Sequence, residues 1–226
     1  MNISAKQLAG CIDHTLLDPT ATKDRIEKLC HEAIEYGFHT VCVNTRWIPL
    51  VSELLHNTQI KIDAVAGFPL GADTTKIKAA QAKEAIFAGA DEVDMVADIA
   101  SIIEGDYKYL SNDIASVLKV CRSMKPPVLL KVIIEAAVLT EEQIIFVCKV
   151  AQEVGVDFVK TSTGMNAAGG ATVEAVRLMK ESAPKCKVKA AGGIRTAAQA
   201  IAMLEAGADR IGTSSSIKII EEFKAM

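Results

Sequence analysis

A short joint between a helix and a strand recurs four times along the chain and limits what it can fold into. Each copy has a helical segment, a glycine, a short link and an apolar strand, as in EYGFHTVCV, FAGADEVDMV, EVGVDFVKTS and EAGADRIGTS. Glycine is expected just after a helix, because it adopts the left-handed backbone conformation without a steric penalty. The glycines are Gly37, Gly89, Gly155 and Gly207. The chain is therefore expected to alternate helices and strands.

Eight strands are predicted when the segments around these joints are added. The strand segments are CIDHTLL, TVCVN, KIDAVAG, EVDMVA, VLLKVII, FVKTS, KVKAA and RIGTS. Most are short and apolar, as parallel strands covered on both faces should be. Helical patterns lie between them, over 22–36, 75–88, 141–154, 172–182 and 197–206.

Strict alternation of this kind is typical of βα units and a parallel sheet. Eight such units favour the α/β class, and within it a closed (β/α)8 TIM barrel rather than an open sheet. We expect one domain over residues 1–226, with a short N-terminal helix ahead of the first strand. Active sites of such barrels lie at the C-terminal ends of the strands.

Composition and charge exclude several classes of function. Half of the residues are hydrophobic and 4% are aromatic, so an aliphatic core is expected. The net charge is −3 with both signs spread along the chain, and this pattern predicts no nucleic-acid partner. The start of the chain is unlike a signal peptide, and the most apolar run, VLLKVIIEAAVL, contains two charges. We therefore expect no membrane association and a cytoplasmic location.

Cysteine and histidine spacing gives no sign of a metal site. The six cysteines are scattered without a C-x-x-C pair, and the four histidines show no metal-ligand spacing. Reduced thiols, mostly in the core, are the expected state of the cysteines.

Three lysines lie within predicted strands: Lys131, Lys160 and Lys189, in the fifth, sixth and seventh. A single lysine at a strand end most often extends to solvent. Three on neighbouring strands of a barrel can instead converge on one cavity. Burial and like charges lower the pKa of a lysine, and a lysine with a lowered pKa attacks carbonyl carbons. We predict Lys160, followed by the small residues TSTG, as a Schiff-base nucleophile and Lys189 as its cationic neighbour.

Asp94 is the most informative carboxylate, because it lies between Val93 and Met95 and needs a partner there. Two roles stay open for Asp94: a salt bridge to a barrel lysine, or general acid–base catalysis in the cavity. The two overlap, because the same pairing would hold the carboxylate near the nucleophile.

Other polar residues in and around the strands are weighed individually. Asp13 and Thr15, in the first strand, are further candidates for the cavity. Asp91 and Glu92 are interpreted as ordinary exposed carboxylates at the start of the fourth strand. Glu135 can equally be a solvated loop residue.

Two turns of small residues follow the seventh and eighth strands, in AAGGIRTAAQA and IGTSSSIKII. Barrels commonly bind phosphate at these two places, through backbone N–H groups and a helix N-terminus. We predict a phosphate site there, although the turns can also serve only as tight connections. Arg195 is either an anion contact or a solvated residue. The small residues concerned are Gly192, Gly193, Gly212, Ser214 and Ser215.

Over nearly its whole length the chain resembles the deoxyribose-phosphate aldolases, a family of class I aldolases with a (β/α)8 barrel. The matching segments, in the family's order, are IDHTLL, VCVN, GFPLGA, GADEVDMV, LKVIIE, DFVKTSTG, KAAGGIR and IGTSS. FVKTSTG together with GFPLGA is highly specific. The resemblance implies reversible cleavage of 2-deoxy-D-ribose 5-phosphate to D-glyceraldehyde 3-phosphate and acetaldehyde, in deoxyribose phosphate breakdown and without a metal or organic cofactor.

The resemblance also implies roles by position. Lys160 matches the Schiff-base lysine, Lys189 the second lysine that perturbs the first and moves protons, and Lys131 a supporting lysine. Asp94 matches the acid–base aspartate. The residues that match the family's phosphate site are Gly164, Gly192, Gly193, Gly212, Ser214 and Ser215. Ala97, Asp98 and Ala191 depart from the family pattern, which puts the rate and the acceptor preference in doubt but not the reaction class.

Two other functions stay open at this level. A transaldolase-like Schiff-base aldolase would act on a ketose phosphate and not on deoxyribose 5-phosphate. A non-catalytic barrel would bind a sugar phosphate without turnover. In each case the partner is a small sugar phosphate, and a homodimer or higher homo-oligomer is the default assembly.

Overall fold

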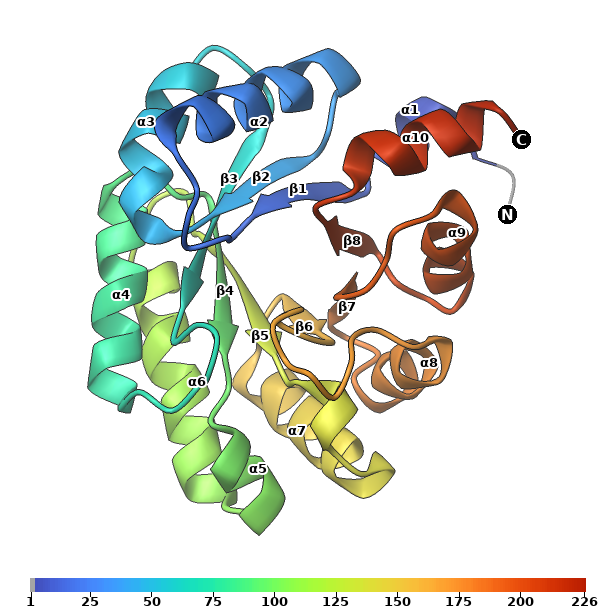
Figure 1. The fold of residues 1–226 in the computed structure, drawn as a ribbon. Helices are drawn as coiled ribbons and strands as arrows, with labels where there is room; N and C mark the ends of the chain where they lie inside the picture. The colour runs from blue at the N-terminus through green and yellow to red at the C-terminus, as the bar shows by residue number, and fades with distance from the viewer. Residues whose placement is uncertain (1–2) are drawn as a thin grey trace.

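The computed structural model describes residues 3–226, whose eight parallel strands close into one barrel (Figure 1). Each strand pairs with the next along the chain, and the last pairs with the first, so the sheet has no free edge. The strands are β1 Ile12–Leu16, β2 Thr40–Val43, β3 Lys61–Ala66, β4 Glu92–Val96, β5 Leu129–Ile133, β6 Phe158–Lys160, β7 Lys187–Ala191 and β8 Arg210–Thr213. The predicted TIM barrel is confirmed.

Helices connect the strands and cover the outside of the barrel (Figure 1). The five predicted helices are present with ends shifted by one residue at most. The α-helices are α1 Ala5–Ala9, α2 Lys23–Tyr36, α3 Ile48–Leu55, α4 Thr75–Phe87, α5 Ile99–Glu104, α6 Tyr107–Arg122, α7 Glu141–Val154, α8 Val173–Ser182, α9 Ala197–Glu205 and α10 Ser216–Lys224. Two 3-10 turns, η1 Thr45–Trp47 and η2 Ala136–Val138, follow β2 and β5. The short helix α1 is the predicted N-terminal helix, and it packs beside α10.

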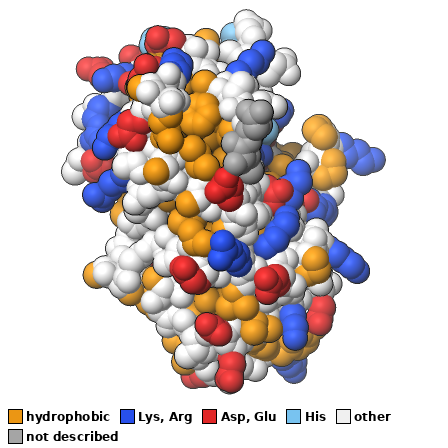
Figure 2. Space-filling model, turned by 90° about the vertical axis from the view of Figure 1, so that its right-hand side faces the viewer, with side chains coloured by type: hydrophobic (Ala, Val, Ile, Leu, Met, Phe, Trp, Pro, Cys, Tyr) orange, Lys and Arg blue, Asp and Glu red, His pale blue; other side chains and the backbone are white. Residues whose placement is uncertain are grey.

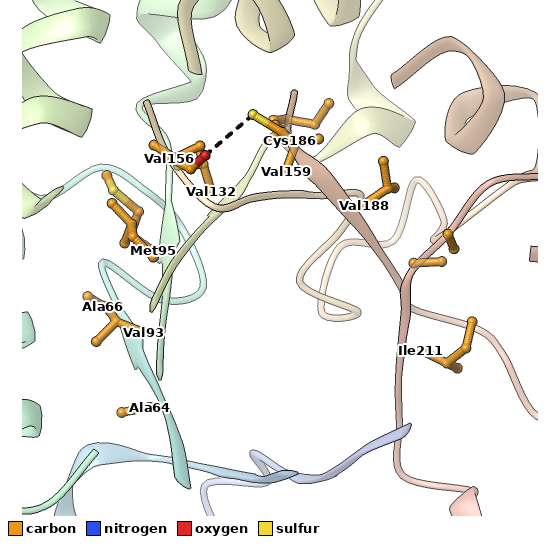
Figure 3. Packing of buried hydrophobic residues seen from close by; sticks show 14 of the residues in the cluster. Ala64, Ala66, Val93, Met95, Val132, Val156, Val159, Cys186, Val188 and Ile211 are labelled. Carbon is orange, nitrogen blue, oxygen red and sulfur yellow. Dashed lines mark hydrogen bonds between the residues drawn. The ribbon is translucent and has the colours of Figure 1, made fainter. Parts of the chain in front are cut away.

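The aliphatic core lies between the barrel and its helices. Alternate strand residues such as Val93, Met95, Val132 and Val188 point away from the barrel axis (Figure 3) and are fully buried. Each fully buried side chain of this size contributes roughly 1.5–3 kcal/mol to folding. The predicted aliphatic core is therefore confirmed. It lies outside the barrel wall, and a second buried region fills the inside of the barrel.

The strand residues that alternate with these apolar ones point into the barrel, and many of them are charged. Asp94 lies between Val93 and Met95, and Lys189 between Val188 and Ala190, with both charged side chains fully buried. The strands therefore alternate between apolar and charged residues, unlike the continuous apolar runs that the sequence suggested. The interior of the barrel is available for chemistry because the outer core carries the hydrophobic stabilisation.

The outer surface carries charges of both signs. Over the face shown in Figure 2, Lys and Arg side chains alternate with Asp and Glu and with small hydrophobic patches. Among residues 3–226, no helix is both long and apolar enough to cross a membrane.

Replacing Thr140 by alanine should lower the free energy of unfolding by about 1 kcal/mol. Its side chain caps α7 by accepting from the Gln143 N–H, and the Gln143 side chain accepts in return from the Thr140 N–H at 2.9 Å. Thr22 occupies the same place before α2 but makes no side-chain cap. Thr22→Ala should therefore cost less than about 0.5 kcal/mol in the same urea titration. Equal losses for the two variants would contradict the assignment.

Candidate active site

A cavity of about 510 Å³ opens at the C-terminal ends of β1, β6, β7 and β8. Most of the predicted site residues line it: Thr15, Lys160, Gly164, Gly192, Gly193, Arg195, Gly212 and Ser214. Lys131, Lys189 and Asp94 do not reach the cavity wall, because they are fully buried beneath it. Ser215 does not line it either, and its N–H donates instead to Thr213 Oγ1 at 2.9 Å.

Asp94 joins the three predicted lysines below the cavity. Lys160 Nζ and Lys189 Nζ both donate to Asp94 Oδ2, each at 2.7 Å. Lys131 Nζ donates to Asp94 Oδ1 at 2.8 Å. Lys131 faces Asp94 across the β4–β5 pair and Lys189 faces Lys160 across the β6–β7 pair, so strand register brings the four side chains together. The expected convergence of the lysines, and the salt bridge of Asp94, are confirmed.

The ionic network continues toward the other end of the barrel. Lys131 also contacts Glu92 at 2.6 Å and Asp63 at 3.1 Å. Lys189 contacts Asp63 at 3.0 Å and Asp13 at 2.5 Å. Arg210 then closes the network.

Arg210 bridges two of the carboxylates, Asp13 and Glu92. Its guanidinium donates to Asp13 at 2.6 Å, to Glu92 at 3.2 Å and to the Thr40 hydroxyl at 2.9 Å. The network thus holds four basic side chains, Lys131, Lys160, Lys189 and Arg210, and four acidic ones, Asp13, Asp63, Glu92 and Asp94. Because the positive and negative side chains are equal in number, their mutual attraction can offset the hydration that each charge loses on burial.

Burial and neighbouring charges set the pKa values within this network. Burial favours the neutral form of Asp94, but Lys131, Lys160 and Lys189 outweigh it and hold the pKa of Asp94 well below its usual range. The pKa of Asp13 is lowered in the same way, with Lys189 as its strongest opposing charge. For Asp63, burial and the nearby Asp94 charge win, and they raise its pKa to about 6.

Lys189, the expected cationic neighbour, and Lys131 both have pKa values above the usual lysine value. Burial lowers the pKa of Lys189, but Asp13, Asp63 and Asp94 outweigh it and raise the pKa well above its usual value. Lys131 is raised likewise, by Asp63, Asp94 and Glu92 acting against burial. The surrounding carboxylates therefore favour the charged forms of Lys131 and Lys189.

Several residues of the site were misjudged or missed from the sequence. Glu92 was interpreted as an exposed carboxylate but is 1% exposed, because the barrel closes over the start of β4. Glu135 is also buried, with φ of 56°, and its carboxylate accepts from the Thr163 hydroxyl at 2.6 Å. Asp63 and Arg210 were not considered. For Asp63 a signal existed, because it is flanked by apolar residues as Asp94 is.

Three glycines let the backbone turns of the cavity approach one another. A Cβ atom at Gly170 would lie 2.2 Å from the Gly192 carbonyl oxygen, and a Cβ at Gly192 would lie 3.3 Å from the Gly164 Cα. Gly164 and Gly192 also have φ values of 80° and 90°, which side chains disfavour. The turn after β6 and the predicted phosphate turn after β7 are thus tightly apposed, and Gly164 and Gly192 line the cavity.

Two charged residues that were not predicted also line the cavity mouth. Arg25 Nη1 donates to Asp18 Oδ2 at 2.9 Å, and both side chains are partly exposed. The Asp18 carboxylate in turn accepts from the backbone N–H and the hydroxyl of Thr20, and these bonds lower the pKa of Asp18 to about 2.

Comparison with known proteins agrees with this arrangement. The model of the DeoC/LacD family of aldolases matches residues 8–221. A deoxyribose-phosphate aldolase of Thermococcus kodakarensis is 52% identical over 97% of this chain and 98% of its own. One of Carboxydothermus hydrogenoformans is 50% identical over 97% and 96%. The solved tetrameric deoxyribose phosphate aldolase of Aeropyrum pernix is similar in fold, with a TM-score of 0.91 and 32% identity over 98% and 93%.

Arg210→Met should lower the free energy of unfolding by about 3–5 kcal/mol, because it leaves the buried carboxylates with one cation too few. Lys61→Met is the matched control, since Lys61 forms an ion pair with Asp91 at 3.4 Å that is largely exposed. It should cost about 0–1 kcal/mol. Urea denaturation of both variants measures the difference, and a small loss for Arg210→Met would mean that the network is not held by charge balance.

The raised pKa of Asp63 predicts a specific pH dependence. A carboxyl with a folded-state pKa of about 6 contributes stability below its unfolded pKa of about 4 and loses it as the pH rises through 6. Asp63→Asn removes this titration and leaves those of Asp13, Glu92 and Asp94. The stability of the wild type relative to the variant should therefore fall between pH 4 and 7, by as much as about 3 kcal/mol. A pH-independent difference in denaturation experiments would contradict the shift.

Proposed function

The chain belongs to the DeoC/LacD family of aldolases, and we propose that it is a class I aldolase that cleaves 2-deoxy-D-ribose 5-phosphate reversibly. The products are D-glyceraldehyde 3-phosphate and acetaldehyde. The observation that carries the proposal is the position of Lys160. Its amine lies at the floor of the cavity, 2.7 Å from the Asp94 carboxylate, with two small-residue turns in the wall beside it.

The reaction begins with attack of the Lys160 amine on the aldehyde carbon, C1. The attacking amine must be neutral, and Asp94 Oδ2 accepts a hydrogen bond from both Lys160 and Lys189. Because Asp94 stays ionised, the Lys160 proton leaves to solvent in the open cavity, and the Asp94 oxygen holds the amine in position. Loss of water from the addition product gives an iminium, whose positive charge attracts electrons from the adjacent carbon.

The C2–C3 bond then breaks while the 3-hydroxyl loses its proton. C3 to C5 leave as glyceraldehyde 3-phosphate, and the bonding electrons form an enamine on the Lys160 nitrogen. Protonation of C2 restores an iminium, and water releases acetaldehyde and the free amine. The atoms balance without an oxidant, a metal or an organic cofactor, because the iminium is the electron sink.

The charged residues beneath Lys160 stabilise the iminium, because they keep an anionic oxygen next to its nitrogen. Lys189 and Lys131 stay protonated, and they keep Asp94 ionised beside the amine that becomes the iminium. An anionic oxygen already aimed at that nitrogen needs no reorganisation when the positive charge forms. Lys131 therefore supports the reaction by fixing Asp94 rather than by touching the substrate.

The phosphate end of the substrate is assigned to the turns after β6, β7 and β8. Gly164, Gly192, Gly193, Gly212 and Ser214 expose backbone and small side chains to the cavity, and Arg195 adds a cation. Backbone N–H groups and a guanidinium are suitable donors for a phosphate. Thr15, on β1 next to β8, lines the same cavity and is assigned to the sugar. Ser215 contributes indirectly, by holding the turn through Thr213.

We further propose that residues 1–226 act as one catalytic domain in the cytoplasm, where phosphorylated sugars are retained. A homo-oligomer is the expected assembly. The Aeropyrum pernix relative is described as tetrameric, and a dimer is the commonest closed form.

Borohydride reduction in the presence of deoxyribose 5-phosphate should attach a substrate-derived mass to Lys160. Reduction traps an iminium as a stable amine, and peptide mass spectrometry then locates it. Lys187, an exposed lysine of β7, is the control position and should stay unmodified. An adduct on another lysine, or none under turnover conditions, would reject Lys160 as the nucleophile.

Lys160→Met should lower kcat by at least about a thousandfold, because the covalent route is lost. Lys187→Met should leave kcat and KM unchanged. Circular dichroism and thermal unfolding of both variants show whether the loss reflects chemistry. Full activity in folded Lys160→Met would remove the residue from the mechanism.

A further inference from the structure

A buried histidine on the first strand links three parts of the fold outside the ionic network. His14 Nε2 lies 2.9 Å from Glu32 Oε2 of α2, and His14 Nδ1 lies 2.9 Å from Ser216 Oγ of α10. His14 is 4% exposed, Ser216 is fully buried, and the imidazole packs on the Phe38 ring with 4.9 Å between centroids. The mechanism above uses none of these side chains.

A serine, a histidine and a glutamate in line are also the parts of a hydrolase triad, but the burial of Ser216 excludes that role. A nucleophile must reach a substrate carbonyl. Neither Ser216 nor His14 lines the cavity, and Ser216 has no exposed surface. The arrangement must therefore act on the protein itself.

Ser216 is the first residue of α10, and it follows the turn that lines the phosphate end of the cavity. Its hydroxyl lies 3.2 Å from the Thr213 carbonyl oxygen. The Thr213 hydroxyl donates to the Ile194 carbonyl at 2.7 Å and accepts from the Ser215 N–H at 2.9 Å. Thr213 therefore ties the turn after β8 to the turn after β7, and the Ser216 hydroxyl lies between the Thr213 carbonyl and His14.

The partners of His14 fix its hydrogens. A carboxylate only accepts, so Nε2 carries a hydrogen and donates to Glu32. In the neutral ring Nδ1 must then accept, and the Ser216 hydroxyl donates to it. In the charged ring both nitrogens donate, so the Ser216 oxygen accepts from Nδ1 and its own hydrogen is free for the Thr213 carbonyl. Ser216 stays bonded to His14 in both states, and protonation adds the bond to Thr213.

We propose that His14 is a positioning residue for the phosphate end of the cavity, acting through Ser216 on the turn Thr213–Ser215. The hydrogen bond from β1 holds the first turn of α10 in place, and with it the small residues that face the phosphate. This inference rests on the proposed function for the identity of the substrate. The existence of the anion site can be measured independently of turnover.

Few charged groups lie near His14, so a change in its protonation can be interpreted from these groups alone. Glu32 is the acidic group that faces it, and Lys28 approaches the other oxygen of Glu32 at 3.7 Å. Ser216 from α10 and Phe38 ahead of β2 are uncharged. Burial lowers the pKa of His14, and the hydrogen bond to Glu32 and its charge partly oppose this shift, so the neutral ring is favoured more than in a free histidine.

Two substitutions of similar size separate the two sides of the ring. His14→Gln places an amide near the Nε2 position, where it still meets Glu32 but loses Ser216. His14→Asn places an amide near the Nδ1 position, where it still meets Ser216 but loses Glu32. Ser216→Ala removes the serine side of the link directly. For each variant, calorimetry measures the binding of inorganic phosphate. Steady-state kinetics measure KM and kcat for deoxyribose 5-phosphate and for unphosphorylated deoxyribose.

We expect His14→Gln and Ser216→Ala to raise the phosphate Kd and the KM for the phosphorylated substrate about fivefold, the effect of one lost hydrogen bond. His14→Asn should change them less than twofold. Turnover of unphosphorylated deoxyribose should stay unchanged in all three. As the pH is lowered and the ring gains its proton, the wild-type KM should fall relative to both His14 variants, because only the wild type gains the bond to Thr213.

Equal effects of His14→Asn and His14→Gln would overturn the proposal, and so would equal losses on the phosphorylated and unphosphorylated substrates, or unchanged phosphate binding in Ser216→Ala. These outcomes differ from failure of the proposed function. In that case the wild type would bind phosphate and respond to the variants, yet would not cleave deoxyribose 5-phosphate.

Discussion

The balance of charge inside the barrel is the constraint on which the rest of the structure depends. A single lysine or carboxylate at the centre of a closed sheet would lose its hydration without compensation. Four cations and four carboxylates meet there instead, and Asp94 alone contacts three lysines. Lys160 differs from the others because it is at the cavity end of the network and contacts one carboxylate. It is the lysine that can leave the network to react without stranding a buried charge elsewhere.

The fold serves this network by separating two tasks. Outward residues of each strand pack against the helices and supply hydrophobic stabilisation, so the inward positions need not be apolar. Parallel register then brings Lys131 beside Asp94 and Lys189 beside Lys160. The phosphate turns extend from the C-terminal ends of the same strands, and Thr213 joins two of them. The reacting lysine and the proposed phosphate site are thus built on the same sheet. The ionic network positions the lysine, and hydrogen bonds of Thr213 position the turns.

Local patterns predicted the fold and part of the site, and the remainder depended on contacts between distant residues. The helix–glycine–strand joints and three lysines in strands are local features, and they led to the barrel and to Lys160. Arg210 contacts Asp13 from 197 residues away, and nothing in the sequence around Arg210 indicates that pairing. The burial of Glu92 was missed for the same kind of reason, because its partner Arg210 is 118 residues away in the sequence. The carboxylates that raise the pKa values of Lys131 and Lys189 come from other strands, and the sequence does not show the register that brings them together.

Release of acetaldehyde from 2-deoxy-D-ribose 5-phosphate by the purified protein tests the central claim most directly. The account predicts equimolar acetaldehyde and glyceraldehyde 3-phosphate without added metal or cofactor, and no glyceraldehyde 3-phosphate from a ketose phosphate donor. A folded protein that releases no acetaldehyde from deoxyribose 5-phosphate, yet yields glyceraldehyde 3-phosphate from a ketose phosphate, would contradict it.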